Sequence, residues 1–253
     1  MLSKSKIKLI QSLNLKKNRD ESGVFLVEGN KMVEEAIRSG FEIEFLACTS
    51  GFAAQHPEIG RRANDWVETD SETISKASLL KNPQEALAIV VQQKDLTPEI
   101  NPENELCLAL DFIQDPGNLG TILRIADWFG ISQVVCSENT VDVFNPKVVQ
   151  ASMGSIFRIK TGITELSGFI KNTATKEIPV YGTFLEGKNI YHESLTSNGI
   201  IVLGNEGNGI SEPISRLISH KLLIPTFSTN ENKPESLNVA VAAAICCSEF
   251  RRK

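Results

Sequence analysis

The second half of the chain alternates between short apolar runs and longer segments with helical periodicity. Residues 106–111 (LCLALD) form a continuous apolar run of the kind that a buried parallel strand shows. A helix is predicted over 119–129, because its apolar residues recur at helical spacing and form one stripe. Further short strands are predicted at 134–136, 179–181, 200–203 and 221–224, and further helices at 145–153, 212–219 and 237–250. This order is typical of an α/β domain with a mainly parallel sheet.

The first half carries strand and helix signals in the order expected of a small α/β domain. Residues 23–27 (GVFLV) favour a buried strand, and residues 31–38 favour a helix that stops before Gly40. Other predicted elements are a short basic helix at 4–13 and strands at 44–48 and 86–91. The order of strand, helix, strand and helix predicts a separate α/β unit.

A polar, proline-containing stretch separates the two halves. Residues 94–105 (KDLTPEINPENE) carry Pro98 and Pro102 and show little apolar periodicity, which is typical of a linker. We therefore predict an N-terminal domain over 1–95, a linker over 96–105 and a second α/β domain over 106–253.

Composition narrows the class of protein. Hydrophobic residues make up 41% of the chain and charged residues 23%, which indicates a globular protein. The net charge of −5 argues against a protein coated in positive charge for non-specific binding to nucleic acid. One basic stretch nevertheless precedes the first acidic residue, Asp20, and consists of Lys4, Lys6, Lys8, Lys16, Lys17 and Arg19.

Cysteines, histidines and apolar runs exclude several other classes of protein. The five cysteines are scattered and the three histidines lie far apart, so we expect neither a disulfide framework nor a metal site. No apolar run reaches the roughly 18 residues of a membrane span, and the N-terminus lacks the apolar stretch of a signal peptide. The expectation is a cytoplasmic protein with no membrane partner.

Three loops follow predicted strands, at the edge of a parallel sheet where ligands bind. The first covers residues 111–120 (DFIQDPGNLG), and the second covers residues 204–209 (GNEGNG). The third runs from Pro225 into Ser236-Leu237-Asn238.

Each loop also has a purely structural explanation. Asn118 could cap the helix that follows it, and Arg124 could be a solvated side chain or could face a ligand above Gly120. The glycines at 204–209 let the backbone approach a ligand closely or simply reverse the chain; their spacing is neither the dinucleotide fingerprint nor a P-loop. Ser236 could cap an alanine-rich final helix that is buried in the fold or against a second subunit.

Taken in order, the three loops resemble the signature motifs of the SpoU (TrmH-like) RNA 2′-O-methyltransferases of the SPOUT superfamily. The match is carried by residues 118–120 with Arg124 and 129–130, by residues 203–207 with 209–211, and by residues 224–225 with 235–239. More weakly, residues 25–29 resemble the start of the family's substrate-binding domain, and residues 151–154 are also similar to the family.

The resemblance implies a fold, a cofactor and an assembly. The fold would be a parallel-sheet α/β domain with a deep C-terminal trefoil knot, preceded by a small α/β domain. S-adenosylmethionine would be the cofactor and S-adenosylhomocysteine the product. The protein would form a homodimer with the knot helices at the interface.

The resemblance also implies roles for individual residues. Those lining the reaction centre would be Asn118, Arg124, Glu206, Ser236 and Asn238. Those holding the cofactor would be Leu203, Gly204, Asn205, Glu206, Gly209, Ile224, Pro225, Ser236 and Leu237. Arg124 would activate the 2′-hydroxyl; since a guanidinium stays protonated, it could favour the alkoxide electrostatically or clamp a phosphate. Residues 226–235 depart from the family pattern, being longer and without glycine, so cofactor contacts there are in doubt.

RNA is the implied substrate, and two alternatives stay open. The extra N-terminal domain is more similar to members that modify ribosomal RNA than to the minimal transfer-RNA enzymes. The basic stretch at 4–19 could contact phosphates or be a solvated helix face. One alternative is an RNA-binding protein of the same fold without catalysis, against which the complete set of site residues counts. The other is a dinucleotide-dependent enzyme, against which the missing G-x-G-x-x-G counts.

Overall fold

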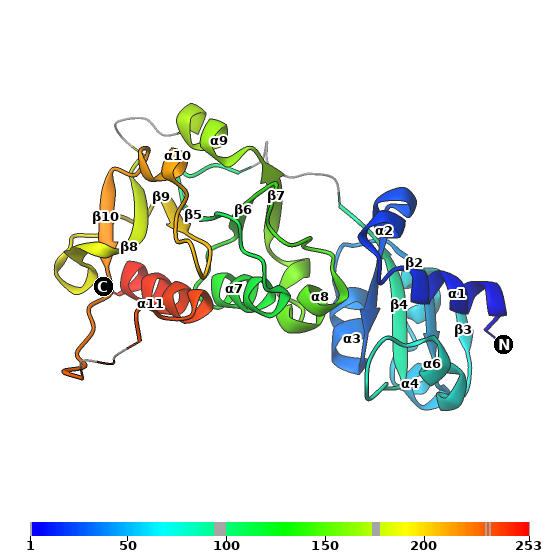
Figure 1. Cartoon of the computed structure of the whole chain (residues 1–253). Helices are drawn as coiled ribbons and strands as arrows, with labels where there is room; N and C mark the ends of the chain where they lie inside the picture. The colour runs from blue at the N-terminus through cyan, green and yellow to red at the C-terminus, as the bar shows by residue number, and fades with distance from the viewer. Residues whose placement is uncertain (1, 94–99, 174–177, 231, 233, 253) are drawn as a thin grey trace. The chain divides into compact units, whose positions relative to one another are not determined.

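The computed structural model describes residues 2–93, 100–173, 178–230, 232 and 234–252, and it divides the chain into two compact units (Figure 1). Unit 1 contains residues 1–94 and Asp142–Arg158, and unit 2 contains residues 95–141 and 159–253. The predicted division assigned residues 142–158 to the second domain, whereas this segment packs with unit 1. Of the predicted linker, residues 96–99 lie outside the described residues, and Ile100 is buried in the core of unit 2.

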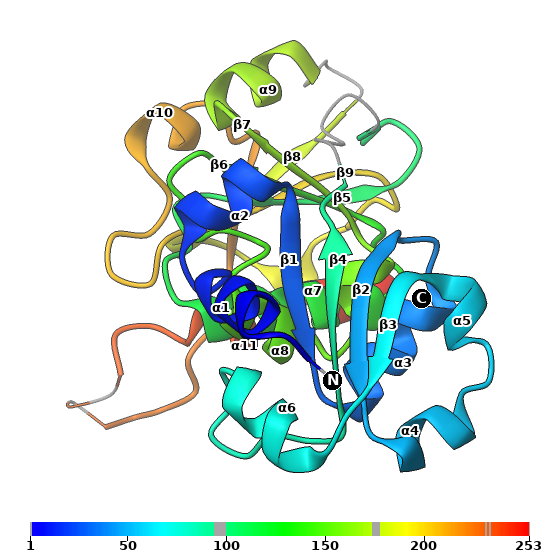
Figure 2. The ribbon, with the colours of Figure 1, turned by 90° about the vertical axis from the view of Figure 1, so that its right-hand side faces the viewer.

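Unit 1 is built on a four-stranded sheet with the order β1-β4-β2-β3, which Figure 2 shows side by side. Strand β4 is antiparallel to both β1 and β2, and β3 is parallel to β2. The strands are β1 (Val24–Glu28), β2 (Ile43–Cys48), β3 (Ala63–Glu68) and β4 (Ala86–Val91). The helices are α1 (Lys4–Ser12), α2 (Lys16–Ser22), α3 (Asn30–Arg38), α4 (Ser50–Gln55), α5 (Ile59–Arg62), α6 (Ser71–Ala77), α8 (Pro146–Ser152) and the 3-10 turn η2 (Ser155–Phe157).

Each face of this sheet buries its own apolar layer. Val24 and Leu26 of β1 share a core with Ile10 of α1 and Ile74 of α6. Phe25 alternates to the opposite face, as successive strand residues do. There its ring lies 4.7 Å from that of Phe144 and 6.3 Å from that of Phe157. The segment 142–158 therefore completes the second face of the unit 1 sheet.

Unit 2 is a six-stranded, fully parallel sheet with the order β10-β8-β9-β5-β6-β7. Helices α7 and α11 lie side by side along one face, and α9 and α10 lie along the other (Figure 1). The strands are β5 (Leu106–Leu110), β6 (Gln133–Ser137), β7 (Lys160–Thr164), β8 (Val180–Asn189), β9 (Gly199–Leu203) and β10 (His220–Leu223). The helices are α7 (Pro116–Trp128), α9 (Leu166–Thr173), α10 (Glu212–Ser215), α11 (Val239–Arg251) and the 3-10 turn η3 (Ile190–His192). The predicted parallel α/β class is confirmed.

Two predicted helix caps are wrong. Helix α7 begins at Pro116 rather than at 119, and its cap is Asp115, whose side chain accepts a hydrogen bond from the N–H of Asn118. Proline suits the first helical position because its missing N–H would be unpaired there anyway. Helix α11 begins at Val239, and Asn238, not Ser236, caps it by accepting from the N–H groups of Ala240 and Val241.

Candidate functional site

The site lies where three neighbouring parallel strands of unit 2 end. Strands β9, β5 and β6 are adjacent, and their carboxyl ends lead into residues 204–209, 111–115 and 138–141. In open parallel sheets this is the edge at which ligands bind. The three motifs predicted from the sequence meet at this edge.

A chain of hydrogen bonds joins the three motifs through their side chains. Asn118 on α7 donates from Nδ2 to Oε1 of Glu206 in the glycine-rich loop, over 2.8 Å. Asn238, at the start of α11, donates from its own Nδ2 to Oδ1 of Asn118, over 3.0 Å. Because Oδ1 of Asn238 is also the cap of α11, the helix start fixes the orientation of all three side chains. The side-chain amide of Asn118 thus links Glu206, 88 positions later in the sequence, to Asn238, 120 positions later.

The glycine-rich loop is held closed by Asn205. Its backbone pairs with that of Gly209 in both directions, at 3.0 and 2.9 Å. Its side chain accepts from the N–H groups of Gly207 and Asn208 and donates to the carbonyl of Phe112. Gly204 has no room for a side chain, since a Cβ there would lie 2.3 Å from the backbone of Gly209. The side chain of Asn205 therefore shapes the loop, whose backbone and exposed Glu206 side chain remain to face a ligand.

Several of the residues predicted to hold the cofactor offer backbone groups or apolar side chains at this edge of the sheet. Gly209 has a φ of 68° and open space where a Cβ would stand, so its backbone is accessible. Ile224 and Pro225 are half-buried at the end of β10, and the Leu237 side chain is half-exposed. Backbone polar groups flanked by apolar side chains are what an adenosine moiety requires. Leu203 is fully buried as the last residue of β9 and can act through its backbone only.

Arg124 lies on α7, six residues after Asn118, and is exposed. Within the described part of the chain it has no hydrogen-bond or ion-pair partner. Ser236 is exposed as well, and no described residue bonds its hydroxyl. Both side chains therefore remain available to a substrate. All eight described residues of the longer 226–235 loop are exposed, among them Phe227, whose ring is 83% exposed.

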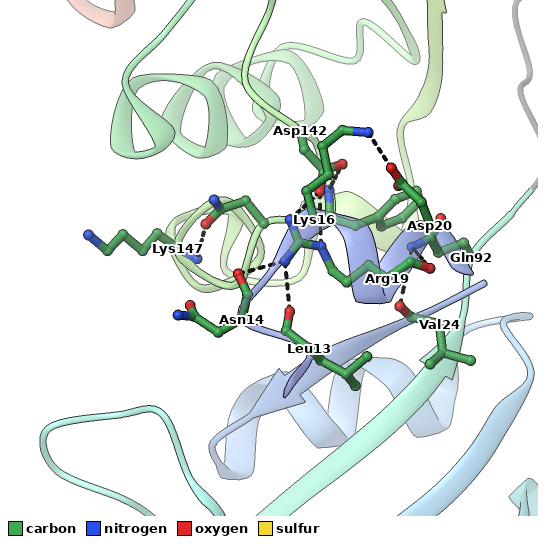
Figure 3. Close-up of polar contacts among 11 residues, drawn as sticks. Leu13, Asn14, Lys16, Arg19, Asp20, Val24, Gln92, Asp142 and Lys147 are labelled. Atoms are coloured by element: carbon green, nitrogen blue, oxygen red, sulfur yellow. Dashed lines mark hydrogen bonds and ion pairs between the residues drawn. The ribbon is translucent and has the colours of Figure 1, made fainter. Parts of the chain in front are cut away.

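The basic stretch of unit 1 is less available to RNA than its sequence indicates. Arg19 is buried, with 1% of its surface exposed, and Figure 3 shows its guanidinium bonded to Asp142 and to the carbonyls of Leu13 and Asn14. The prediction that Arg19 contacts RNA is wrong, because the side chain is buried and each of its three guanidinium nitrogens already has a partner inside the unit. Lys16 and Lys17 are exposed but paired with Asp20 and Glu21.

The remaining lysines of the basic stretch, Lys4, Lys6 and Lys8, lie on helix α1. The ammonium of Lys6 lies over the Phe45 ring, 4.3 Å from its centroid. Lys4 and Lys8 are exposed. If unit 1 contacts phosphates through this stretch, Lys4 and Lys8 are its best-placed cations.

All five cysteines are buried, and burial raises the pKa of Cys136 and Cys247 to about 12, so these thiols are not nucleophiles at neutral pH. In the described ranges no cluster of three or more His, Cys, Asp or Glu side chains could hold a metal ion. No helix there is long and apolar enough to cross a membrane.

Three residues of the site edge were not predicted from the sequence. Asp111 is buried and accepts from the N–H of Ser211, which closes the far end of the glycine-rich loop. Phe112 has a φ of 61°, which a bulky side chain rarely adopts. Ser137, at the end of β6, accepts from the N–H of Phe112. Only the position of Asp111 directly after a buried strand could have pointed to it.

Comparison with known proteins identifies the class to which this site belongs. Residues 105–248 match the model of the SpoU rRNA Methylase family, and residues 4–88 match that of the MRM3-like substrate binding domain. Fold and site together define an RNA methyltransferase with an additional N-terminal domain. The chain belongs to the SpoU rRNA Methylase family.

Individual relatives support this placement over nearly the whole chain. The chain is 32% identical to the 23S rRNA guanosine 2′-O-methyltransferase RlmP of Bacillus subtilis, over 97% of this chain and 96% of that protein. A solved rRNA methyltransferase from Sinorhizobium meliloti with bound AdoMet has a TM-score of 0.86 and 31% identity, covering 99% of this chain and 96% of that one. A TrmH-family structure from Porphyromonas gingivalis has the same TM-score and 37% identity, covering 99% and 98%.

Proposed function

We propose that this protein transfers a methyl group from S-adenosylmethionine to a ribose 2′-hydroxyl of ribosomal RNA. The observation that carries the proposal is the hydrogen-bonded chain Asn238–Asn118–Glu206, together with an exposed Arg124 on the same helix as Asn118, for which no described residue supplies a hydrogen bond or ion pair. A relative that aligns over 96% of its length is named as a 23S rRNA methyltransferase, and a structural relative was solved with AdoMet. These relatives favour ribosomal RNA over transfer RNA as the substrate.

The reaction requires alignment and charge control more than covalent help from the protein. S-adenosylmethionine, when bound, supplies an electrophilic methyl group, and the ribose oxygen must stand about 3 Å from it. Asn118 holds Oε1 of Glu206, which leaves the second carboxylate oxygen to accept a hydrogen bond from a ribose or from the cofactor. The guanidinium of Arg124 can lower the energy of a developing alkoxide, or it can bind the adjacent phosphate with two donors.

We infer a homodimer formed through α7 and α11. Trp128 on α7 is 84% exposed, and Val241 on α11 is exposed on the neighbouring helix. Exposed apolar side chains on two helices that pack against each other indicate an interaction surface. A homodimer with these helices at its centre is also what the family resemblance implies.

We infer two further properties from family membership. The last helix would pass through a trefoil knot; the tie between Asn238 and Asn118 and the close approach of Gly204 to Gly209 are compatible with such threading. We infer that the protein works in the cytoplasm, because the bacterial relative RlmP is named as a methyltransferase of 23S rRNA.

The proposal is tested by two measurements on the purified full-length chain. Calorimetric titration with S-adenosylmethionine should show saturable binding, and incubation with ribosomal RNA should transfer labelled methyl groups. Arg124→Ala should lower turnover at least about a hundredfold, as loss of a charge-stabilising donor does, with little change in cofactor affinity. The matched control is Arg216→Ala on α10, an exposed arginine paired with Glu212, which should behave like the wild type.

Each outcome has a defined meaning. Wild-type turnover in the Arg124 variant would remove that residue from the reaction. If the protein bound RNA but bound no cofactor, whether or not RNA was present, it would instead be an RNA-binding protein of this fold that lacks catalysis.

A further inference from the structure

Phe112 has a strained backbone at the site edge, and two side chains hold it. Its φ of 61° lies in the left-handed region, which a large side chain rarely adopts. Such conformations persist only where the surrounding structure fixes them. Here the N–H of Phe112 donates to Oγ of Ser137 over 2.8 Å, and its carbonyl accepts from Nδ2 of Asn205 over 2.9 Å.

The strain follows from where these two partners lie. In an extended strand the N–H and C=O of one residue point toward the same neighbouring strand. Phe112 follows β5, the middle strand, and its two partners belong to opposite neighbours: Ser137 ends β6, and Asn205 follows β9. Its N–H and C=O can reach opposite sides only if the backbone leaves the extended conformation. The N–H and C=O of Phe112 therefore form a cross-tie between β6 and β9, the two flanking strands.

Ser137 is itself anchored, so it can fix the tie. Its hydroxyl lies 3.1 Å from Oγ1 of Thr140, which donates to the carbonyl of Leu110. Since the single hydroxyl hydrogen of Thr140 is used in that bond, Ser137 must donate to Thr140. Its remaining acceptor capacity then serves the N–H of Phe112.

The other end of the tie reaches the glycine-rich loop. Nδ2 of Asn205 donates to the carbonyl of Phe112, and Oδ1 of Asn205 accepts from the N–H groups of Gly207 and Asn208. Rotation of the Asn205 amide would release these three bonds together. The position of the loop backbone, on which Glu206 also stands, thus depends on the carbonyl of Phe112.

We propose that Ser137 is a positioning residue of the methyl-transfer site, which acts through the strained peptide of Phe112 and through Asn205 on the cofactor loop 204–209. It touches neither cofactor nor ribose. Its effect is to keep Phe112 in the conformation that presents its carbonyl to Asn205. This inference deepens the proposed function and rests on it for the identity of the ligand.

The experiment compares Ser137→Ala with a matched serine at the opposite end of the same strand. Ser132 is half-buried like Ser137, and its hydroxyl bonds Glu105, far from the loop in the fold. In the full-length chain Ser137→Ala should weaken S-adenosylmethionine binding about tenfold, as expected when a buried N–H loses its acceptor. Amide hydrogen exchange across 205–209 should accelerate by a similar factor. Ser132→Ala should change neither measurement, and Ser137→Thr, which keeps the hydroxyl, should restore both.

A second background tests whether the route runs through backbone strain. Glycine adopts a positive φ without penalty, so Phe112→Gly should make the tie less dependent on Ser137. In the Phe112→Gly background, Ser137→Ala should weaken S-adenosylmethionine binding by threefold or less. An equal loss in both backgrounds would overturn the proposal, as would wild-type affinity and exchange in Ser137→Ala.

The controls separate this inference from the proposed function and from misfolding. If the wild type binds no S-adenosylmethionine, the proposed function fails, and hydrogen exchange of 205–209 alone decides whether Ser137 positions the loop. If Ser137→Ala does not fold, Ser137→Cys, a close isostere with a weak acceptor, replaces it, with the same expected loss and the same refuting result.

Discussion

Replacing Arg19 removes a buried charge and a set of hydrogen bonds from unit 1. Its Nε and Nη2 donate to Oδ2 of Asp142 over 2.9 and 2.5 Å, and its Nη1 donates to the carbonyls of Leu13 and Asn14 over 2.7 and 3.0 Å. The side chain of Asp142 is only 10% exposed. Replacing Arg19 by Met keeps most of the apolar volume but removes the charge and every donor.

The expected loss in the free energy of unfolding comes from the groups that lose Arg19 as their partner. Asp142 becomes a carboxylate with little access to water, and two carbonyls lose their partners. Breaking a buried ion pair by removing one partner costs about 3–5 kcal/mol, which is a large share of the 5–15 kcal/mol that folded domains typically have. Lys16 and Asp20 form an exposed ion pair four residues apart on one helix, which should contribute only about 0.3–0.5 kcal/mol to the free energy of unfolding.

The assay exploits the two tryptophans, of which Trp66 lies in unit 1 and Trp128 in unit 2. In a Trp128→Phe background, fluorescence during urea unfolding reports on unit 1 alone. Arg19→Met should lower the urea midpoint strongly, whereas Lys16→Met should leave it nearly unchanged. Adding Asp142→Asn to Arg19→Met should recover part of the loss, because the stranded charge is then gone.

The reasoning would be refuted by a small effect. If Arg19→Met cost less than about 1 kcal/mol, the pair would have to be solvated rather than buried. If Asp142→Asn made the loss worse, an isolated carboxylate would not be its source.

Three further predictions concern the site, the assembly and a buried carboxyl group. Gly204→Ala should abolish cofactor binding, because its Cβ would stand 2.3 Å from backbone atoms, while Gly207→Ala, whose nearest contact is 3.6 Å, should bind normally in calorimetry. Trp128→Glu should shift the protein from dimer to monomer in analytical ultracentrifugation; an unchanged mass would remove α7 from the proposed interface. Burial raises the pKa of Glu28, so the folded state binds its proton more tightly than the unfolded state. The free energy of unfolding should therefore fall as pH rises above the ordinary glutamate range. Glu28→Gln should flatten this dependence in urea titrations between pH 4 and 8; an unchanged slope would show that Glu28 is not its source.

The apolar runs predicted the strands that carry the site, because a strand buried on both faces must be apolar throughout. Residues 106–111 and 200–203 are β5 and β9 almost to the residue. Strands β3 and β7 were missed, since each lies at a sheet edge with several exposed residues and shows no such run. The caps were misassigned because Asp115, Asn118, Ser236 and Asn238 all have capping chemistry, and only backbone geometry decides which one is used.

The sequence by itself determined the class of fold, the order of the three motifs and the residue types that can hold a cofactor and a ribose. These properties depend on local composition and spacing, which folding does not alter. Tertiary structure alone decided which side chains meet. It paired Asn118 with Glu206 and Asn238, buried Arg19 against Asp142, and placed residues 142–158 in unit 1. Contacts between residues about a hundred positions apart depend on the register and order of strands, and no local pattern in the chain encodes them.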